Sequence, residues 1–157
     1  MQDNKHIVLS FVEELWNNRK LEVADRIFDQ NCYTHQLQSG APEVATPRGP
    51  DAVKAHVTAW LSGFPDLKFT AKQMFADEER VFSQLAMNGT QTGHWMGIPP
   101  TGKRINIKMM TIHRIRAGKI IEDWVLVETL GLLQQFGALP PTGDILSGFI
   151  QRLNSPA

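Results

Sequence analysis

The sequence has little that would mark a specialised class of protein, whether charge, cysteine or long apolar runs. Its 157 residues carry 16 Lys and Arg against 16 Asp and Glu, so the formal net charge is zero. This balance leaves no surplus of cations to neutralise phosphates, which argues against nucleic acid and against an anionic membrane surface as partners. No stretch approaches the ~18 consecutive apolar residues of a membrane span. We therefore expect no nucleic-acid partner and no membrane partner.

Cysteine is limited to Cys32, which excludes an intrachain disulfide and a thiolate metal cluster. We expect this side chain to be a small buried apolar group. The first 15 residues carry four charges and lack the apolar run of a signal peptide, so a cytoplasmic location is expected. The length fits one domain spanning residues 1–157.

Motifs for bound groups are also missing. The five histidines show no metal-ligand spacing, and there is neither a Gly-x-Ser-x-Gly nucleophile motif nor a phosphate-binding glycine loop. We therefore predict no metal and no cofactor.

The first half of the chain shows the apolar spacing of helices. Residues 7, 8, 11, 12, 15 and 16 form a wide apolar stripe on one helix face. A shorter helix is predicted over 21–28, and a third from about Asp51 to Gly63, where Phe64-Pro65-Asp66 ends it. The segment 40–50, rich in proline and glycine, is predicted as a loop.

The second half alternates apolar and polar residues, as half-exposed strands do. Strands are predicted over 67–72, 81–92, 104–116 and 119–129, and short helices over 132–136 and 145–153. Ala117-Gly118 joins the last two strands as a two-residue hairpin turn. Helices followed by antiparallel strands indicate an α+β fold.

The hairpin predicts which side chains share a face. A two-residue turn places Arg116 opposite Lys119, and regular pairing extends from there, with opposed residues on the same side. One face then carries Ile107, Met109, Thr111, His113, Glu122, Trp124, Leu126 and Glu128. The other carries Lys108, Met110, Ile112, Arg114, Ile121, Asp123, Val125 and Val127. The first set is typical of a small-molecule pocket, although a β-bulge would exchange the faces beyond it.

Glu128 is the candidate acid/base residue of this pocket. Apolar neighbours would leave its carboxylate little water, and desolvation strengthens a carboxylate as a base. Such a base can remove a proton from a carbon next to a carbonyl. The alternative is that Glu128 lies exposed at the strand end or caps the next helix.

Other residues near this site also have two interpretations. His113 is either a donor to a developing enolate or a structural hydrogen-bonding residue. Trp124 is either core or a donor to a substrate oxygen. Asp123 is expected to be solvated or at a subunit interface, and Glu122 to be exposed.

Four motifs resemble the SnoaL-like polyketide cyclase family. They are GTQTGHWMGIPPTGK over 89–103, FPDL over 64–67, GKIIEDW over 118–124 and LGLLQQFG over 130–137. The similarity runs from about residue 5 to 140, and residues 141–157 look like an addition.

The resemblance implies the cone-shaped, cystatin-like α+β barrel of nuclear transport factor and ketosteroid isomerase, in which a curved antiparallel sheet and N-terminal helices surround a pocket. Family cyclases close a ring of an anthracycline-type polyketide methyl ester by an intramolecular aldol reaction, without metal or cofactor. Their acid/base aspartate lies four residues after the hairpin Trp, which is the position of Glu128.

The resemblance also implies further site residues. His113 is the nearest match to a family histidine, and His35 matches a pocket histidine of many relatives. Gln91 and Gln84 depart from the family, which often has His and Arg at these positions.

The predicted catalytic residues are Glu128 and His113. The predicted substrate-binding residues are His35, Trp124, Thr111, Trp16, Trp60, Met109 and Gln91.

Two main functions remain open at this point, beside a third, a structural dimerisation module. The first is an enzyme, either a cyclase or an isomerase like ketosteroid isomerase, acting on a small hydrophobic molecule. The second is a non-catalytic pocket protein that binds such a molecule. A homodimer or higher homo-oligomer is expected through the outer sheet face, where Lys108, Met110, Ile112, Val125 and Val127 would form a mixed apolar patch.

Overall fold

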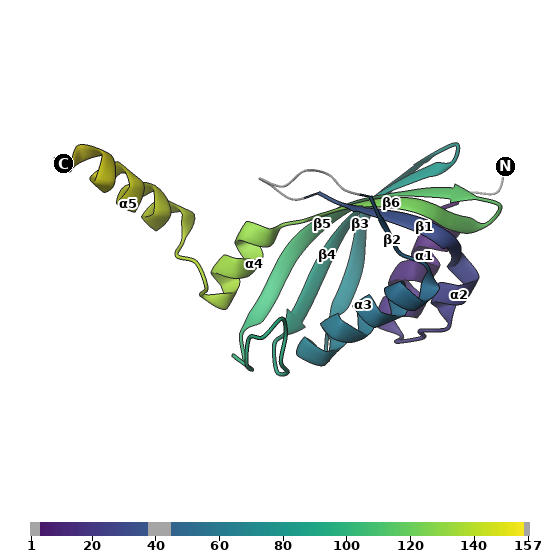
Figure 1. Ribbon diagram of the computed structural model, residues 1–157, viewed down its shortest axis with the longest axis horizontal. Coiled ribbons are helices and arrows are strands. Elements are labelled where there is room, and N and C mark those ends of the chain that lie inside the picture. The colour runs from purple at the N-terminus through teal and green to yellow at the C-terminus, as the bar shows by residue number, and fades with distance from the viewer. Residues whose placement is uncertain (1–3, 38–44, 156–157) are drawn as a thin grey trace.

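The computed structural model describes residues 4–37 and 45–155, so residues 40–44 of the predicted loop lie outside it. Three helical segments come first, two strands and a long helix follow, and a run of four long strands then leads to two C-terminal helices (Figure 1). The helices are α1 (Lys5–Leu9), the π-helical η1 (Ser10–Asn17), α2 (Val23–Ile27), α3 (Pro50–Gly63), α4 (Thr129–Phe136) and α5 (Thr142–Asn154). The strands are β1 (Phe28–Gln36), β2 (Ala45–Pro47), β3 (Lys68–Asp77), β4 (Arg80–Thr90), β5 (Arg104–Arg116) and β6 (Lys119–Val127).

The six strands form one sheet in the order β2-β1-β6-β5-β4-β3. Strands β3 to β6 are an antiparallel meander, as their alternating patterns predict. Strand β1, however, pairs with β6 in parallel, so the sheet is mixed and the expectation of a purely antiparallel sheet is wrong. Strands β1 and β2 were not predicted. The polar run Asp29-Gln30-Asn31 hides the alternation of β1, and β2 is only three residues long.

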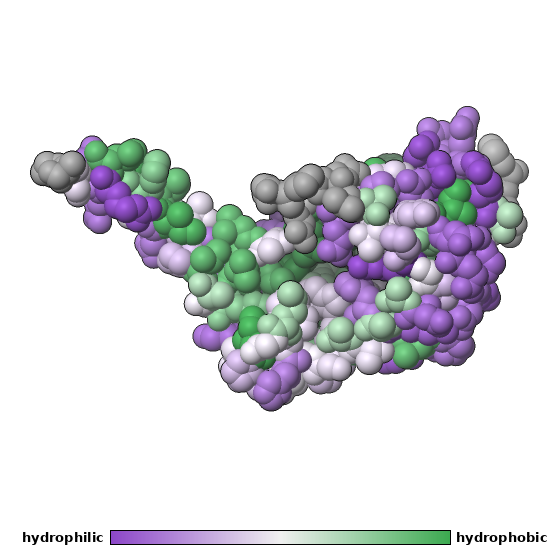
Figure 2. Space-filling model, viewed as in Figure 1, coloured by the Kyte–Doolittle hydropathy of each residue, from purple (hydrophilic) through white to green (hydrophobic). Residues whose placement is uncertain are grey.

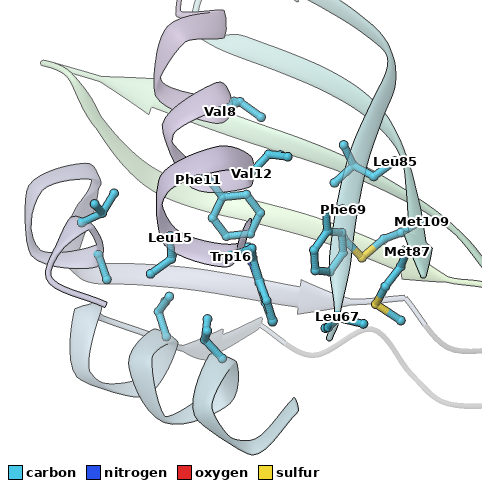
Figure 3. Packing of buried hydrophobic residues seen from close by; sticks show 14 of the residues in the cluster. Val8, Phe11, Val12, Leu15, Trp16, Leu67, Phe69, Leu85, Met87 and Met109 are labelled. Atoms are coloured by element: carbon cyan, nitrogen blue, oxygen red, sulfur yellow. The ribbon is translucent and has the colours of Figure 1, made fainter. Parts of the chain in front are cut away.

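The core lies between the sheet and the N-terminal helices. Helix α1 continues into η1, and their predicted apolar stripe is buried against β3, β4 and β5 (Figure 3). Phe11, Leu15 and Trp16 come from the helical side, and Phe69 and Met109 from the sheet. Each such buried side chain contributes about 1.5–3 kcal/mol to folding. Cys32 is fully buried, as predicted.

The C-terminal helix α5 projects away from the rest of the molecule (Figure 1). None of its residues is buried, and the apolar side chains of Leu146, Phe149, Ile150 and Leu153 remain at least half exposed. Figure 2 shows this apolar surface continuing over α4. No helix among the described residues is long and apolar enough to cross a membrane.

Candidate active site

A cavity of about 80 Å³ lies between the concave face of the sheet, η1 and α3. Most of its wall is apolar or aromatic. The predicted substrate-binding residues Trp16, Trp60, Met109 and Thr111 all line it, as does His113. This composition is typical of a site that holds an apolar molecule and orients it with a few polar groups.

A wider hollow of about 370 Å³ adjoins the cavity. Its wall extends outward to Trp95, Met96 and, on α4, Thr129 and Leu132. The residues that line both spaces are Gln36, Arg48, His56, Trp60, Val125 and Val127. The hollow is therefore the outer part of a single two-part site, and these shared residues surround the junction.

The pairing of β5 with β6 decides which side chains reach the cavity. Arg116 pairs with Lys119 and Ile115 with Ile120, as the two-residue turn predicts. Arg114 then pairs with Glu122, so Ile121 is the extra residue of a β-bulge. Beyond it the predicted faces on β6 are exchanged.

Asp123, Val125 and Val127 consequently face the cavity. The predicted assignment of Glu122, Trp124 and Leu126 to the same face as His113 is wrong for these three residues. The patch expected on the outer face is also wrong for Val125 and Val127, whereas Met110, Ile112 and Leu126 are exposed there.

Asp123 is the carboxylate of the cavity. It pairs directly with His113 across the strands, its residue is only 5% exposed, and its Oδ1 has no hydrogen-bond partner among the described residues. Burial raises the pKa of Asp123 to about 6, against the opposing effects of the Thr34 hydroxyl and the Arg48 guanidinium. A carboxylate with this pKa is ionised at neutral pH and is a stronger base than an ordinary aspartate.

His113 is fully buried beside Asp123 and packs against Phe11, with ring centroids 5.2 Å apart. Burial lowers its pKa to about 4, so the imidazole is neutral at pH 7. Its Nδ1 lies 3.4 Å from Thr111 Oγ1, and Nε2 has no partner within the described residues. In the tautomer in which Nδ1 accepts a hydrogen bond from the hydroxyl of Thr111, Nε2 carries a hydrogen and can donate a hydrogen bond to a bound oxygen.

The junction between cavity and hollow holds a second histidine and an arginine. Burial and the nearby positive charge of Arg48 lower the pKa of His56 to about 4, so this imidazole is neutral as well. The ring of His56 meets Trp16 edge to face, with centroids 6.1 Å apart. Arg48 and Asp123 are thus the charged residues of the cavity wall at neutral pH.

A metal site is not formed by the part of the chain that the structure describes, since no group of three or more His, Cys, Asp or Glu side chains there could hold an ion. The groups that line the cavity are suited to proton transfer by a carboxylate, Asp123, beside a neutral imidazole, His113.

Comparison with known proteins places this fold and site in a family. The family model of the SnoaL-like polyketide cyclases matches residues 6–136 of this sequence. This chain belongs to the SnoaL-like polyketide cyclase family. The aklanonic acid methyl ester cyclase DauD of Streptomyces sp. (strain C5) is 30% identical over 142 residues, which cover 88% of this chain and 84% of that protein.

Solved structures show the same fold. AclR from Streptomyces galilaeus matches with a TM-score of 0.74 at 26% identity, covering 87% of this chain and 97% of AclR. A protein from Jannaschia sp. CCS1 also has a TM-score of 0.74, at 21% identity, with coverage of 87% and 93%. The predicted α+β fold of the nuclear transport factor type is confirmed.

Glu128 of this SnoaL-like chain does not line the cavity, and the prediction that it lies there is wrong. It is exposed, immediately precedes α4, and its Oε2 accepts a hydrogen bond of 3.2 Å from the backbone N–H of Lys108. The β-bulge explains why the prediction failed. It directs Glu128 away from the cavity and directs Asp123 into it, so that Asp123 is the carboxylate that is buried.

His35 and Trp124 lie together on the outer face of the sheet, outside the cavity lining, so their prediction as pocket residues is wrong. Their rings stack 4.8 Å apart at 8°. His35 Nε2 is 2.9 Å from Glu122 Oε1, and Arg114 Nη2 is 3.3 Å from Glu122 Oε2. Alternation along β1 directs Thr34 inward and His35 outward.

Gln91 is buried but does not line the cavity either. Its Nε2 donates to the carbonyls of Gly93, Ile98 and Pro99, and its Oε1 accepts from the backbone N–H and hydroxyl of Thr101. The side chain therefore holds the β4–β5 connection in shape, which corrects its prediction as a substrate-binding residue.

Asp123, Arg48 and His56 are the site residues that the sequence did not reveal. His56 follows Val53 by three residues on α3, so helical spacing could have placed it toward the core. Predicting Asp123 as a site residue would have required knowledge of the β-bulge. Predicting Arg48 would have required the positions of β1 and β2 in the sheet.

Proposed function

We propose that this chain catalyses intramolecular aldol ring closure of a polyketide-like ester without a cofactor, with Asp123 as the acid/base group. The observation that carries the proposal is a buried, ionisable Asp123 directly opposite a neutral His113 on a largely apolar cavity. The membership in a cyclase family supports the same reaction class.

Asp123 and His113 can together account for the proton transfers of the reaction. Ionised Asp123 takes the proton from the carbon next to a carbonyl, and the electron pair of that C–H bond forms an enolate. His113 Nε2–H donates a hydrogen bond to the enolate oxygen. The enolate carbon attacks a second carbonyl of the same molecule, a C–C bond forms, and the new alkoxide takes the proton back from Asp123. Holding both carbonyls together contributes several kcal/mol through proximity alone.

The dimensions of the site limit how a substrate enters. A cavity of about 80 Å³ takes the reacting end of a polyketide, and the adjoining hollow of about 370 Å³ takes the remainder. The expected partner is thus a small hydrophobic molecule with an apolar body and several oxygen atoms.

Exposed Met110, Ile112 and Leu126 on the outer face support a homodimer, which sedimentation of the purified chain would test.

Kinetics with aklanonic acid methyl ester, the compound in the name of the relative DauD, test the role of Asp123. Asp123→Asn should lower kcat at least about 100-fold, as loss of a general base does. Glu122→Gln, its neighbour on the outer face, and Glu128→Gln should each leave kcat within about two-fold. Turnover by Asp123→Asn within about three-fold of the unmodified chain would overturn the proposed role.

A second function, binding without catalysis, is favoured by one observation. Trp16, Phe28 and Phe69 narrow the inner cavity to about 80 Å³, which leaves little room for a substrate to fold on itself. Tight binding of the ester with no ring closure by the unmodified chain would support this function over the cyclase.

A further inference from the structure

Arg48 has no assigned part in the proton transfer, yet its side chain lines both the cavity and the hollow. Its guanidinium makes no hydrogen bond and no ion pair with any residue in the described ranges 4–37 and 45–155. A partly buried arginine on an apolar wall ordinarily has such a partner.

The backbone at this position is held firmly. Arg48 N–H donates a 2.7 Å hydrogen bond to Cys32 O on β1, and the preceding residue Pro47 pairs with Tyr33. At Gly49 a Cβ atom would come within 2.6 Å of Gln30 O, so only glycine permits this close approach of the two backbones. The backbone that carries the Arg48 side chain is consequently rigid, and the side chain extends from it to the junction of cavity and hollow.

Among the residues that the structure describes, no ion pair neutralises the charge of Arg48. The two lining histidines, His56 and His113, are neutral at pH 7. Asp123 is the opposite charge on the wall, but the two side chains form no ion pair, and Arg48 acts on the pKa of Asp123 and of His56 only through its field. Within the described part of the chain, the junction therefore combines a cation that has no ion-pair partner with the apolar side chains of Trp60, Val125 and Val127.

We propose that Arg48 binds an ionised oxygen, a phenolate or an enolate, of the ligand at the junction of cavity and hollow. This inference rests on the proposed function, because it names the ligand class of the same site. A guanidinium matches such an oxygen through charge-assisted hydrogen bonds, while the apolar wall contacts the flat body of the ligand. Gln36, which lines the same junction, supplies an amide that can donate to a neighbouring oxygen.

The test uses two probes of nearly the same shape, 2-hydroxyanthraquinone and 2-methoxyanthraquinone, at a pH where the hydroxyl of the first is ionised in water. Only the first can present an anionic oxygen. The dissociation constants are measured by calorimetry, and the phenolate absorption band reports whether the bound hydroxy probe is ionised.

The unmodified chain should bind the ionised probe at least about ten-fold tighter than the methoxy probe, the size of a charge-assisted hydrogen bond. Arg48→Met should reduce this ratio to within about two-fold and leave affinity for the methoxy probe nearly unchanged. Arg48→Lys, which keeps the charge without the planar fork, should retain part of the ratio. Arg80→Met, which removes an exposed cation outside the cavity lining, should have no effect.

A ratio near one in the unmodified chain, or a ratio that survives Arg48→Met, would overturn the proposal, and so would failure of the chain to bind either probe. The outcome is separate from that of the proposed function. Asp123→Asn should keep the preference for the ionised probe even though it loses turnover.

Kinetics also distinguish the two sources of the ionised oxygen, a phenolate of the ligand and an enolate formed in the reaction. If Arg48→Met raises KM for aklanonic acid methyl ester and spares kcat, the oxygen is charged in the ground state. If it lowers kcat, the oxygen gains its charge as the enolate forms.

Discussion

Glu122 and Asp123 are adjacent carboxylates on β6 with opposite surroundings. Glu122 faces outward and is held by His35 and Arg114. Asp123 faces inward, where burial raises its pKa to about 6 and no other described residue forms an ion pair with it. The same functional group is a structural anchor on one face of the hairpin and a potential base on the other. The difference shows that the chemistry of this sheet is set by the face on which a side chain lies.

The largest expected contrast between the two faces is in packing. Ile107 is fully buried on the inner face of β5, whereas Ile112 on the outer face of the same strand is 37% exposed. Ile107→Ala should lower the free energy of unfolding by about 3–4 kcal/mol, since it leaves a cavity. Ile112→Ala should cost less than about 1 kcal/mol. Urea unfolding of both variants measures the contrast, and equal losses would mean that the outer face is covered in solution.

The next contrast concerns the effect of pH on stability. The pKa of Asp123 is raised in the folded state, so its contribution to stability is greatest below the ordinary aspartate pKa and is lost as pH rises toward and through about 6. Asp123→Asn removes this loss. Relative to the unmodified chain, the variant should therefore gain about 2–3 kcal/mol of stability between pH 4 and pH 7. Glu122→Gln, measured in the same urea series, should show no comparable gain.

His113 should show the opposite dependence on pH. Its pKa is lowered to about 4 in the folded state, so its contribution is complete above the ordinary histidine pKa and is lost as pH falls toward 4. Between pH 7 and pH 5 the unmodified chain should lose about 2 kcal/mol through this residue. His113→Gln should lose less over the same interval. Thermal unfolding at the two pH values, with the exposed His94→Gln as control, measures the difference.

The smallest expected effect belongs to the ion pairs of the outer face. Glu122→Gln weakens the contacts with His35 and Arg114, which are only partly buried, and should cost about 1 kcal/mol. High salt should reduce the cost, because partly exposed charges are screened. A loss of 3 kcal/mol or more in urea unfolding would show that this outer cluster is as important to the fold as the core.

Much of the fold could be predicted from local patterns. The apolar stripe of residues 7–16, the presence of strands β3 to β6 and the turn at Ala117-Gly118 each depend on neighbours in sequence, and each is confirmed, although register shifts interrupt the alternation in β3 and β6. The pairing of β1 with β6 could not be predicted, since it joins segments far apart in the chain and β1 carries three consecutive polar residues.

The candidate site was predicted only as far as the bulge. Met109, Thr111 and His113 precede the irregular pairing on β5 and lie where alternation places them. Ile120 and Ile121 are identical residues, so nothing in their side chains reveals which one is extra. A single inserted residue exchanges faces in a strand with a period of two, and the prediction therefore selected Glu128 and Trp124 in place of Asp123 and Val125.

The parallel pairing of β1 with β6 has a consequence for synthesis. The last residue of β1, Gln36, precedes the end of β6 at Val127 by about 90 residues. At a translation rate of roughly 5–20 residues per second, this interval lasts on the order of 5–20 s. Until β6 has left the ribosome, β1 lacks its principal neighbour, although β3, β4 and β5, which cover the apolar side of α1 and η1, have already been synthesised. The nascent chain is thus vulnerable to aggregation and to chaperone capture at least until β6 has been synthesised as far as Val127.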